Sequence, residues 1–204
     1  MVGLFTVSGE ADALVHLRAA DIAGLEQADQ GVVTLEGEVA SQTHVRERQV
    51  GFVFQNPENQ IVMPLVAEDL AFGAKNLGLR GAELSARVDG VLQRLGIAHL
   101  AERESYALSG GEKQLVALAS VLVMEPSTIV FDEPTTMLDR RNRRRLQATI
   151  DELDQRAVVV THDLELIGGY DRVLVVHEGR IAAELAAADA TEEAVMRAAT
   201  GSTA

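Results

Sequence analysis

Two short segments of the sequence carry residues suited to binding a phosphate group and activating a water. The first is Leu108–Gln114, in which Ser109 precedes Gly110 and Gly111. The glycines let the backbone approach a ligand closely, and the serine adds a hydroxyl donor. A helix predicted over 112–124 would aim its free N–H groups and positive dipole end at that ligand. Taken alone, such a turn is more often only a helix cap.

The second segment places two adjacent carboxylates at the end of a predicted strand. Residues 128–132 read TIVFD, a β-branched and aromatic run, and Glu133 follows Asp132. Ligands bind at the carboxyl edge of the strands in open α/β sheets. Asp132 could hold Mg²⁺ there, and Glu133, facing another way, could act as general base on a water. The alternative is a pair of exposed acids at a strand end.

Two more polar residues follow predicted strands. Gln55 comes after the apolar run Val50–Phe54, and its carboxamide could ligate Mg²⁺ or hold a water. His162 comes after Val158–Thr161 and could contact a terminal phosphate. Either residue alone is usually a surface or packing residue, so a functional role for each depends on the two segments above.

The elements that must position these residues alternate along the chain. Helical periodicity predicts helices at 67–78, 83–95, 112–124 and about 141–154, and apolar runs predict strands at 50–54, 128–132, 158–161, 173–176 and 181–185. Such alternation predicts an α/β fold with a mainly parallel sheet. We expect one domain over 1–204, an inserted helical lobe at 57–107, and a C-terminal tail over 186–204 that ends in a loose helix. Residues 1–30 show no firm period.

The composition excludes several classes of function. The chain has 204 residues, 47% of them hydrophobic, and a charge of 18 − 31 = −13, which argues against binding nucleic acid through the whole surface. It has no cysteine, so disulfide scaffolds, zinc–thiolate sites and cysteine nucleophiles are excluded. The arginine run at 140–145 is interpreted as a solvated helix face, since aromatic residues are only 3% of the chain. We find no signal peptide or spanning segment, and expect a cytosolic chain that a partner brings to the membrane.

In chain order, these motifs resemble the nucleotide-binding subunit of an ABC transporter over about Gly31 to Arg180. LSGGEKQ is similar to the family's signature loop, TIVFDE to its Walker B strand with the catalytic glutamate, and MLD to its D-loop. Gln55 is similar in position to the family's Q-loop glutamine, and His162 to its switch histidine.

The resemblance implies a P-loop NTPase-like fold, ATP and Mg²⁺ as ligands, and ATP hydrolysis in a head-to-tail dimer of ATPase subunits, either a homodimer or a heterodimer. It implies that Glu133 is the general base, that Asp132 and Gln55 serve Mg²⁺, and that His162 senses the γ-phosphate. It also implies that Ser109, Gly110 and Gly111 contact the nucleotide bound by the second subunit, and that Asp139 couples the two sites.

The run QNPENQIVMPLVAEDLAFG narrows the resemblance to energy-coupling-factor importers of the cobalt and biotin type, and most closely to the biotin type. In that group residues 55–78 would dock on a transmembrane subunit, which places the chain at the cytoplasmic face of the cell membrane. Another subunit chooses the transported solute.

The sequence departs from the family at the phosphate loop. The pattern G-x4-G-K-S/T does not occur, and the only lysines are Lys75 and Lys113. One alignment uses Ser8–Asp12 and puts Glu10 at the lysine position, whereas another puts Val15 there. A carboxylate about 4 Å from a phosphate would cost roughly 4 kcal/mol at an effective dielectric of about 20. We therefore expect weak ATP binding and little turnover by the chain alone.

Three interpretations stay open. The chain is a transporter ATPase whose N-terminal part is truncated, frameshifted or divergent, or it is a non-hydrolysing partner that lends its signature loop to an intact subunit. The third is an ABC-type ATPase outside transport, against which the docking resemblance at 55–78 argues.

Overall fold

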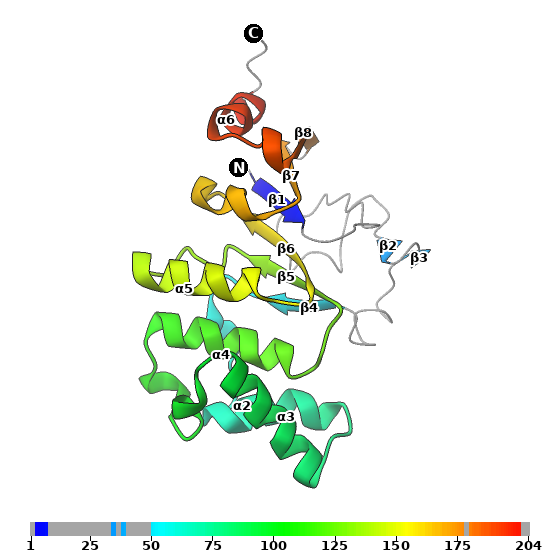
Figure 1. Ribbon diagram of the computed structural model, residues 1–204. Helices are drawn as coiled ribbons and strands as arrows, with labels where there is room; N and C mark the ends of the chain where they lie inside the picture. Colours follow the sequence, from blue (N-terminus) through cyan, green and yellow to red (C-terminus); the bar gives the residue numbers. More distant parts are fainter. Residues whose placement is uncertain (1–2, 8–33, 36–37, 40–49, 178–179, 201–204) are drawn as a thin grey trace.

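The computed structural model describes residues 3–7, 34–35, 38–39, 50–177 and 180–200. They form a six-stranded sheet with helices packed around it (Figure 1), in the order β4-β5-β6-β1-β7-β8. The strands are β1 (Gly3–Val7), β4 (Val50–Val53), β5 (Thr128–Asp132), β6 (Arg156–Thr161), β7 (Arg172–His177) and β8 (Arg180–Ala186). A separate hairpin joins β2 (Thr34–Leu35) to β3 (Glu38–Val39).

Four of the six strands run in one direction. β4, β5 and β6 pair in parallel, β1 is antiparallel to both β6 and β7, and β8 is antiparallel to β7. Hence β7 runs the same way as β6, and the sheet is mixed but mainly parallel. This confirms the predicted fold class.

The helices lie close to the predicted ranges. They are α2 (Val66–Asn76), α3 (Gly81–Arg94), α4 (Gly110–Leu122), α5 (Arg140–Asp151) and α6 (Glu192–Thr200), with short 3₁₀ helices η2 (Pro57–Asn59), η3 (Ala98–Leu100), η4 (Ser105–Ala107), η5 (Leu164–Gly169) and η6 (Ala187–Asp189). α2, α3 and α4 gather at one end of the molecule, and α6 packs on β7 and β8 at the other (Figure 1). Of the described helices, none combines the length and apolarity of a membrane span.

The core lies between α4 and the parallel strands. Phe131, Ile129 and Leu118 are fully buried, and burial of each side chain contributes about 2–3 kcal/mol. α4 crosses β4 so closely that a Cβ on Gly51 would lie 2.3 Å from Val121 Cγ1, so only glycine fits there. This packing holds the last turn of α4 against β4.

Two polar side chains, the buried Asp69 and the half-buried Gln60, anchor the helical lobe to α4. Asp69 is 4% exposed and accepts hydrogen bonds from the N–H of Val62 (2.8 Å) and of Met63 (3.0 Å), and from Ser120 Oγ (2.6 Å). Gln60 accepts from Phe54 N–H and donates to the carbonyl of α4 residue 117. The connection that follows β4 is therefore held against α4 on both sides.

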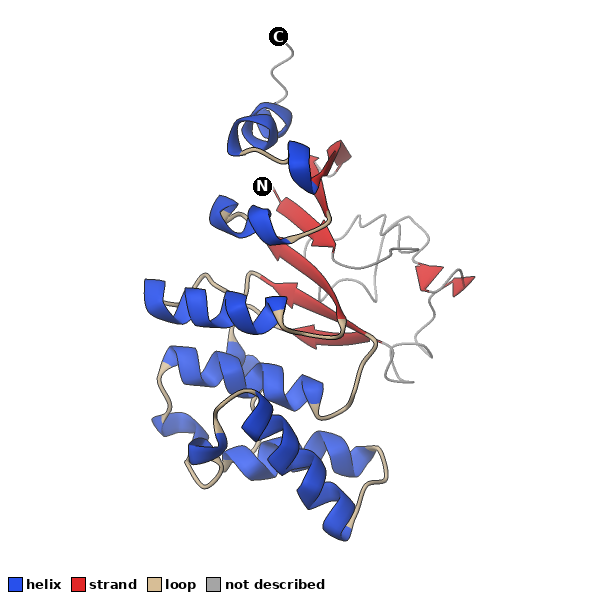
Figure 2. Cartoon of the chain, viewed as in Figure 1, coloured by secondary structure: helices blue, strands red, loops and turns tan. Residues whose placement is uncertain are grey.

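Strand β1 lies between β6 and β7 and runs against them, as its arrowhead shows in Figure 2. Leu4 pairs with Thr161, the last residue of β6, whereas Val7 pairs with Val158 and with Arg172, the first residue of β7. β1 therefore starts at the edge where β6 ends and finishes toward the opposite edge. The two candidate phosphate-loop alignments, at Ser8–Asp12 and at Val15, lie outside the described residues.

Candidate functional site

The parallel strands bring four of the predicted residues to one edge of the sheet. Val53 pairs with Phe131, and Asp132 pairs with Val160. Because these strands run in the same direction, the residues that follow them emerge at the same edge. The structure thus places Gln55, Asp132, Glu133 and His162 there, as the sequence predicts.

Glu133 has an unusual backbone conformation. Its φ is 44°, in the left-handed region, which costs a residue with a side chain about 1–2 kcal/mol. Its N–H still donates to Val160 O at 2.8 Å, and its carbonyl accepts from Thr136 N–H at 3.2 Å. The chain therefore turns sharply straight after β5, and the Glu133 side chain faces the loop after β6.

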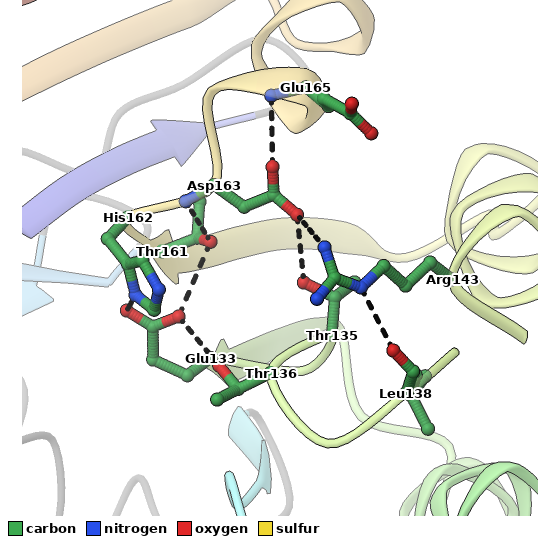
Figure 3. A network of polar contacts seen from close by, with 9 residues as sticks. All are labelled: Glu133, Thr135, Thr136, Leu138, Arg143, Thr161, His162, Asp163 and Glu165. Carbon is green, nitrogen blue, oxygen red and sulfur yellow. Dashed lines mark hydrogen bonds and ion pairs between the residues drawn. The ribbon is translucent and has the colours of Figure 1, made fainter. Parts of the chain in front are cut away.

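The Glu133 carboxylate is held by three donors from two loops (Figure 3). Oε1 lies 2.7 Å from His162 Nδ1, and Oε2 accepts from Thr136 Oγ1 at 3.1 Å and more weakly from Thr161 Oγ1 at 3.5 Å. The Glu133 side chain is 18% exposed, whereas that of His162 is 65% exposed. The pair therefore presents a sheltered carboxylate beside an accessible imidazole, which suits activation of a water next to a phosphate.

Asp132 and Gln55 supply further oxygen atoms at this edge. The Asp132 side chain is half-buried and that of Gln55 is exposed. Among the described residues, no group of three or more histidine, cysteine or acidic side chains could hold a metal. The oxygen donors here suit Mg²⁺, which normally keeps waters and phosphate oxygens among its ligands.

Ser109 caps α4 through a reciprocal capping box. Its N–H (2.8 Å) and its hydroxyl (2.6 Å) both donate to Glu112 Oε2, while Glu112 N–H approaches Ser109 Oγ at 3.4 Å. These hydrogen bonds from Ser109 lower the pKa of Glu112. Ser109 and Gly110 are exposed at the start of α4, where an anion could bind, whereas Gly111 is buried.

The turn Ser109–Gly111 packs against the loop before α5. A Cβ on Gly111 would lie 2.4 Å from Asn142 Cγ, and one on Gly110 would lie 3.6 Å from Met137 O. Across the described part of the chain, no hydrogen bond or ion pair joins this turn to the Glu133–His162 pair. The described residues thus present two polar centres that no hydrogen bond or ion pair links directly.

Asp139 caps the other helix at this edge. Its carboxylate accepts from Asn142 N–H (2.8 Å) and from Asn142 Nδ2 (3.1 Å) at the start of α5. Asp139 is exposed, so a second molecule could still reach it.

The sequence interpretation missed two residues of the site, Arg143 and Asp163. Arg143, assigned to a solvated face, donates through Nη1 to Asp163 Oδ2 at 3.2 Å, next to His162 in the chain. The missed signal is spacing, because Arg143 precedes the buried residues Leu146 and Ile150 by three and seven positions.

Both lysines of the chain lie in helices. Lys113, in the first turn of α4, forms an ion pair with Glu58, which lowers the pKa of Glu58. Lys75 lies in the last turn of α2, in the helical lobe.

Comparison with known proteins gives consistent similarities. The model of the ABC transporter family matches residues 19–136. The biotin transport ATP-binding protein BioM of Rhizobium etli is 48% identical over 169 residues, which are 83% of this chain and 75% of that protein. The cobalt import ATP-binding protein CbiO of Syntrophus aciditrophicus is 45% identical over 179 residues, 85% of this chain and 62% of that protein. The solved structure of cbiO1 from Clostridium perfringens, part of the ABC transporter complex cbiONQ, aligns with a TM-score of 0.70 and 32% identity over 79% of this chain and 68% of that chain.

Proposed function

This chain belongs to the ABC transporter family, and on that premise we propose that it is the ATP-binding subunit of an energy-coupling-factor importer, coupling ATP hydrolysis to uptake of a solute. Relatives named for biotin and cobalt transport support this subgroup. Biotin is the solute that the sequence motif favours, but a membrane subunit would select it. In this proposal the chain works at the cytoplasmic face of the membrane.

One observation carries the proposal. The Ser109–Gly111 turn, exposed at Ser109 and Gly110, and the Glu133–His162 pair each have the groups to engage a nucleotide phosphate, yet no hydrogen bond or ion pair among the described residues joins them. This separation supports composite sites between two ATPase subunits. The turn of this chain would contact a nucleotide held by the second subunit, and the pair would serve the nucleotide on this chain's own sheet edge. Asp139, exposed beside the turn, would couple the two sites.

Each residue at the sheet edge has a proposed role in hydrolysis. Asp132 and Gln55 offer oxygen ligands for Mg²⁺, which when bound neutralises charge on the phosphate oxygens. Glu133, fixed by its three donors, orients the attacking water and accepts its proton. His162 Nδ1 faces Glu133, and in the imidazolium form of the ring Nε2 also carries a proton, which it would donate to the γ-phosphate.

Exposed apolar residues support docking of the membrane subunit on residues 55–78. Val62 is 62% exposed and Phe72 is 42% exposed. Tyr106, 72% exposed, lies on the segment that pairs with this region through the Leu65–Glu104 bridge. Because large apolar side chains are costly to leave in water, their grouping here fits a surface that a partner covers.

The position of the lysines favours a second candidate function. Lys113 is paired with Glu58 and Lys75 lies in the lobe, so neither matches a phosphate-loop lysine. The chain would then be a non-hydrolysing partner that lends its Ser109–Gly111 turn to a competent subunit.

The experiment measures ATP hydrolysis by the chain assembled with a second ATPase subunit and a membrane subunit. Ser109→Ala should reduce the rate under both functions, whereas Glu133→Gln should reduce it only if this chain's own edge is hydrolytic. Ser85→Ala is the matched control, because Ser85 is an exposed serine on α3. A rate that Ser109→Ala leaves unchanged would contradict both functions.

A further inference from the structure

A single arginine on α5 joins two loops at the carboxyl edge of the sheet (Figure 3). Nε of Arg143 donates to Leu138 O at 3.0 Å, and Nη1 donates to Asp163 Oδ2 at 3.2 Å. The Asp163 side chain is 17% exposed, whereas Asp154, which pairs with Arg94 on the surface, is 89% exposed. Because water is largely kept from Asp163, its ion pair is less screened than a surface pair.

Asp163 fixes the backbone of its own loop. Its Oδ1 accepts from Glu165 N–H at 3.1 Å, and its N–H donates to Oγ1 of the buried Thr161 at 3.0 Å. Oδ2, which binds Arg143, also receives a longer contact of 3.5 Å from Thr135 Oγ1. The Asp163 carboxylate therefore joins three segments of the chain: the loop after β5, helix α5 and the loop after β6.

His162 stands between Thr161 and Asp163 and depends on this loop for its position. Its ring is 65% exposed, and its side-chain partner among the described residues is Glu133. The backbone that Asp163 and Arg143 hold therefore restrains where the imidazole lies, together with its 2.7 Å contact with Glu133.

Arg143 also contacts Leu138, whose loop packs against the Ser109–Gly111 turn. Leu138 follows Met137, whose carbonyl lies 3.6 Å from a Cβ placed on Gly110. Asn142, directly before Arg143, packs on Gly111. The guanidinium thus connects the loop that packs on one polar centre with the loop that carries His162 at the other.

We propose that Arg143 is a positioning residue that fixes the His162 loop to the Leu138–Asp139 loop, so that the Ser109–Gly111 turn and the Glu133–His162 pair shift together. Its effect on turnover rests on the proposed ATPase function. The contacts by which Arg143 holds the two loops together, called the clamp below, are a property of the chain itself and do not rest on that function.

Hydrogen exchange on the full chain tests the clamp without any ATP hydrolysis. Arg143→Gln should speed exchange of the amides in 161–166 by about tenfold, because it removes a charge-assisted hydrogen bond that holds Asp163. Arg144→Gln is the matched control, since Arg144 is exposed and the described part of the chain shows no ion pair for it. Unchanged exchange in Arg143→Gln would overturn the proposal.

Steady-state kinetics of the assembly tests the consequence for catalysis. Arg143→Gln should lower kcat about tenfold and leave KM for Mg-ATP within about twofold, because Arg143 acts through His162 rather than on the nucleotide. The double variant Arg143→Gln/Asp163→Asn should be no slower than either single variant, since both remove one interaction. Arg143→Lys keeps the charge without the planar fork and should restore part of the rate.

The hydrogen-exchange and kinetic experiments distinguish a failure of the clamp from a failure of the proposed ATPase function. An assembly with wild-type chain that does not hydrolyse ATP would contradict the proposed function, while the exchange result would still decide the clamp. An active assembly whose kcat is unaffected by Arg143→Gln, or in which the two substitutions add, would overturn the positioning role.

Discussion

Replacing Gly111 by alanine tests how closely the Ser109–Gly111 turn packs on α5. The added Cβ would lie 2.4 Å from Asn142 Cγ and 2.7 Å from both terminal atoms of that side chain. Because carbon atoms normally stay about 3.5–4.0 Å apart, Asn142 must rotate away. The rotation breaks the 3.1 Å hydrogen bond from Asn142 Nδ2 to Asp139.

The expected loss of stability follows from these changes. Overpacking costs about 1–3 kcal/mol, and the lost hydrogen bond costs about 0.5–1.5 kcal/mol. The higher helix propensity of alanine offsets up to about 1 kcal/mol. We therefore expect Gly111→Ala to lower the free energy of unfolding by about 2 kcal/mol, within a range of about 0.5–3.5 kcal/mol.

Urea unfolding of the full chain measures this difference, with Asn142→Ala as the relieving substitution. Asn142→Ala alone should lose about 0.5–1.5 kcal/mol with the hydrogen bond to Asp139, partly offset by the higher helix propensity of alanine. The double variant should recover at least about 1 kcal/mol relative to Gly111→Ala, because the overpacking is relieved. Gly90→Ala is the matched control, because a Cβ there meets nothing within 4 Å, and it should be stabilising. A Gly111→Ala chain as stable as the wild type, or a double variant as unstable as Gly111→Ala, would refute the packing.

Three further predictions concern polar side chains. Asp69→Ala should lower the free energy of unfolding by about 2–4 kcal/mol and Asp69→Asn by less, because asparagine keeps an acceptor for the two loop N–H groups; equal losses in urea unfolding would refute this. Because the pKa of Glu112 is lowered in the folded chain, its contribution to stability is present above the usual value of 4.5 and is lost as pH falls below it. The unfolding free energy should therefore fall more steeply with acid in the wild type than in Glu112→Gln, and parallel pH profiles would contradict the Ser109–Glu112 contacts. The hydrogen bond to Glu104 raises the pKa of Tyr106, so Glu104→Gln should shift the tyrosinate absorbance titration to lower pH, and an unshifted curve would exclude that contact.

Much of the architecture could be predicted because it rests on local patterns. TIVFD was expected as a strand and is β5, since a β-branched and aromatic run fits a buried strand. The apolar stripe of α3 is buried at Val88, Val91 and Leu92, as helical spacing predicts. The edge residues Gln55, Glu133 and His162 come together because parallel strands end at one edge.

Other features depend on long-range contacts that periodicity does not encode. β1 was not predicted, because its place between β6 and β7 is set by pairing with residues far along the chain. Asp69 follows the helical pattern of a solvent-facing acid, yet it is buried by hydrogen bonds to Val62, Met63 and Ser120. Arg143 sits within a run of arginines, and its spacing to Leu146 and Ile150 places it on the inner face of α5, but periodicity does not show that its partner is Asp163.

Protection of a single thiol would test the composite site most directly. The chain has no cysteine, so Ser109→Cys introduces the only thiol, at an exposed position in the turn. In the assembly with a second ATPase subunit, a non-hydrolysable ATP analogue with Mg²⁺ should slow maleimide modification of this thiol. The same analogue should have no effect on the chain alone, nor on the Ser85→Cys control in the assembly. Protection in the chain alone at a concentration where it is a monomer, or no protection in the assembly, would contradict a nucleotide site shared between two subunits.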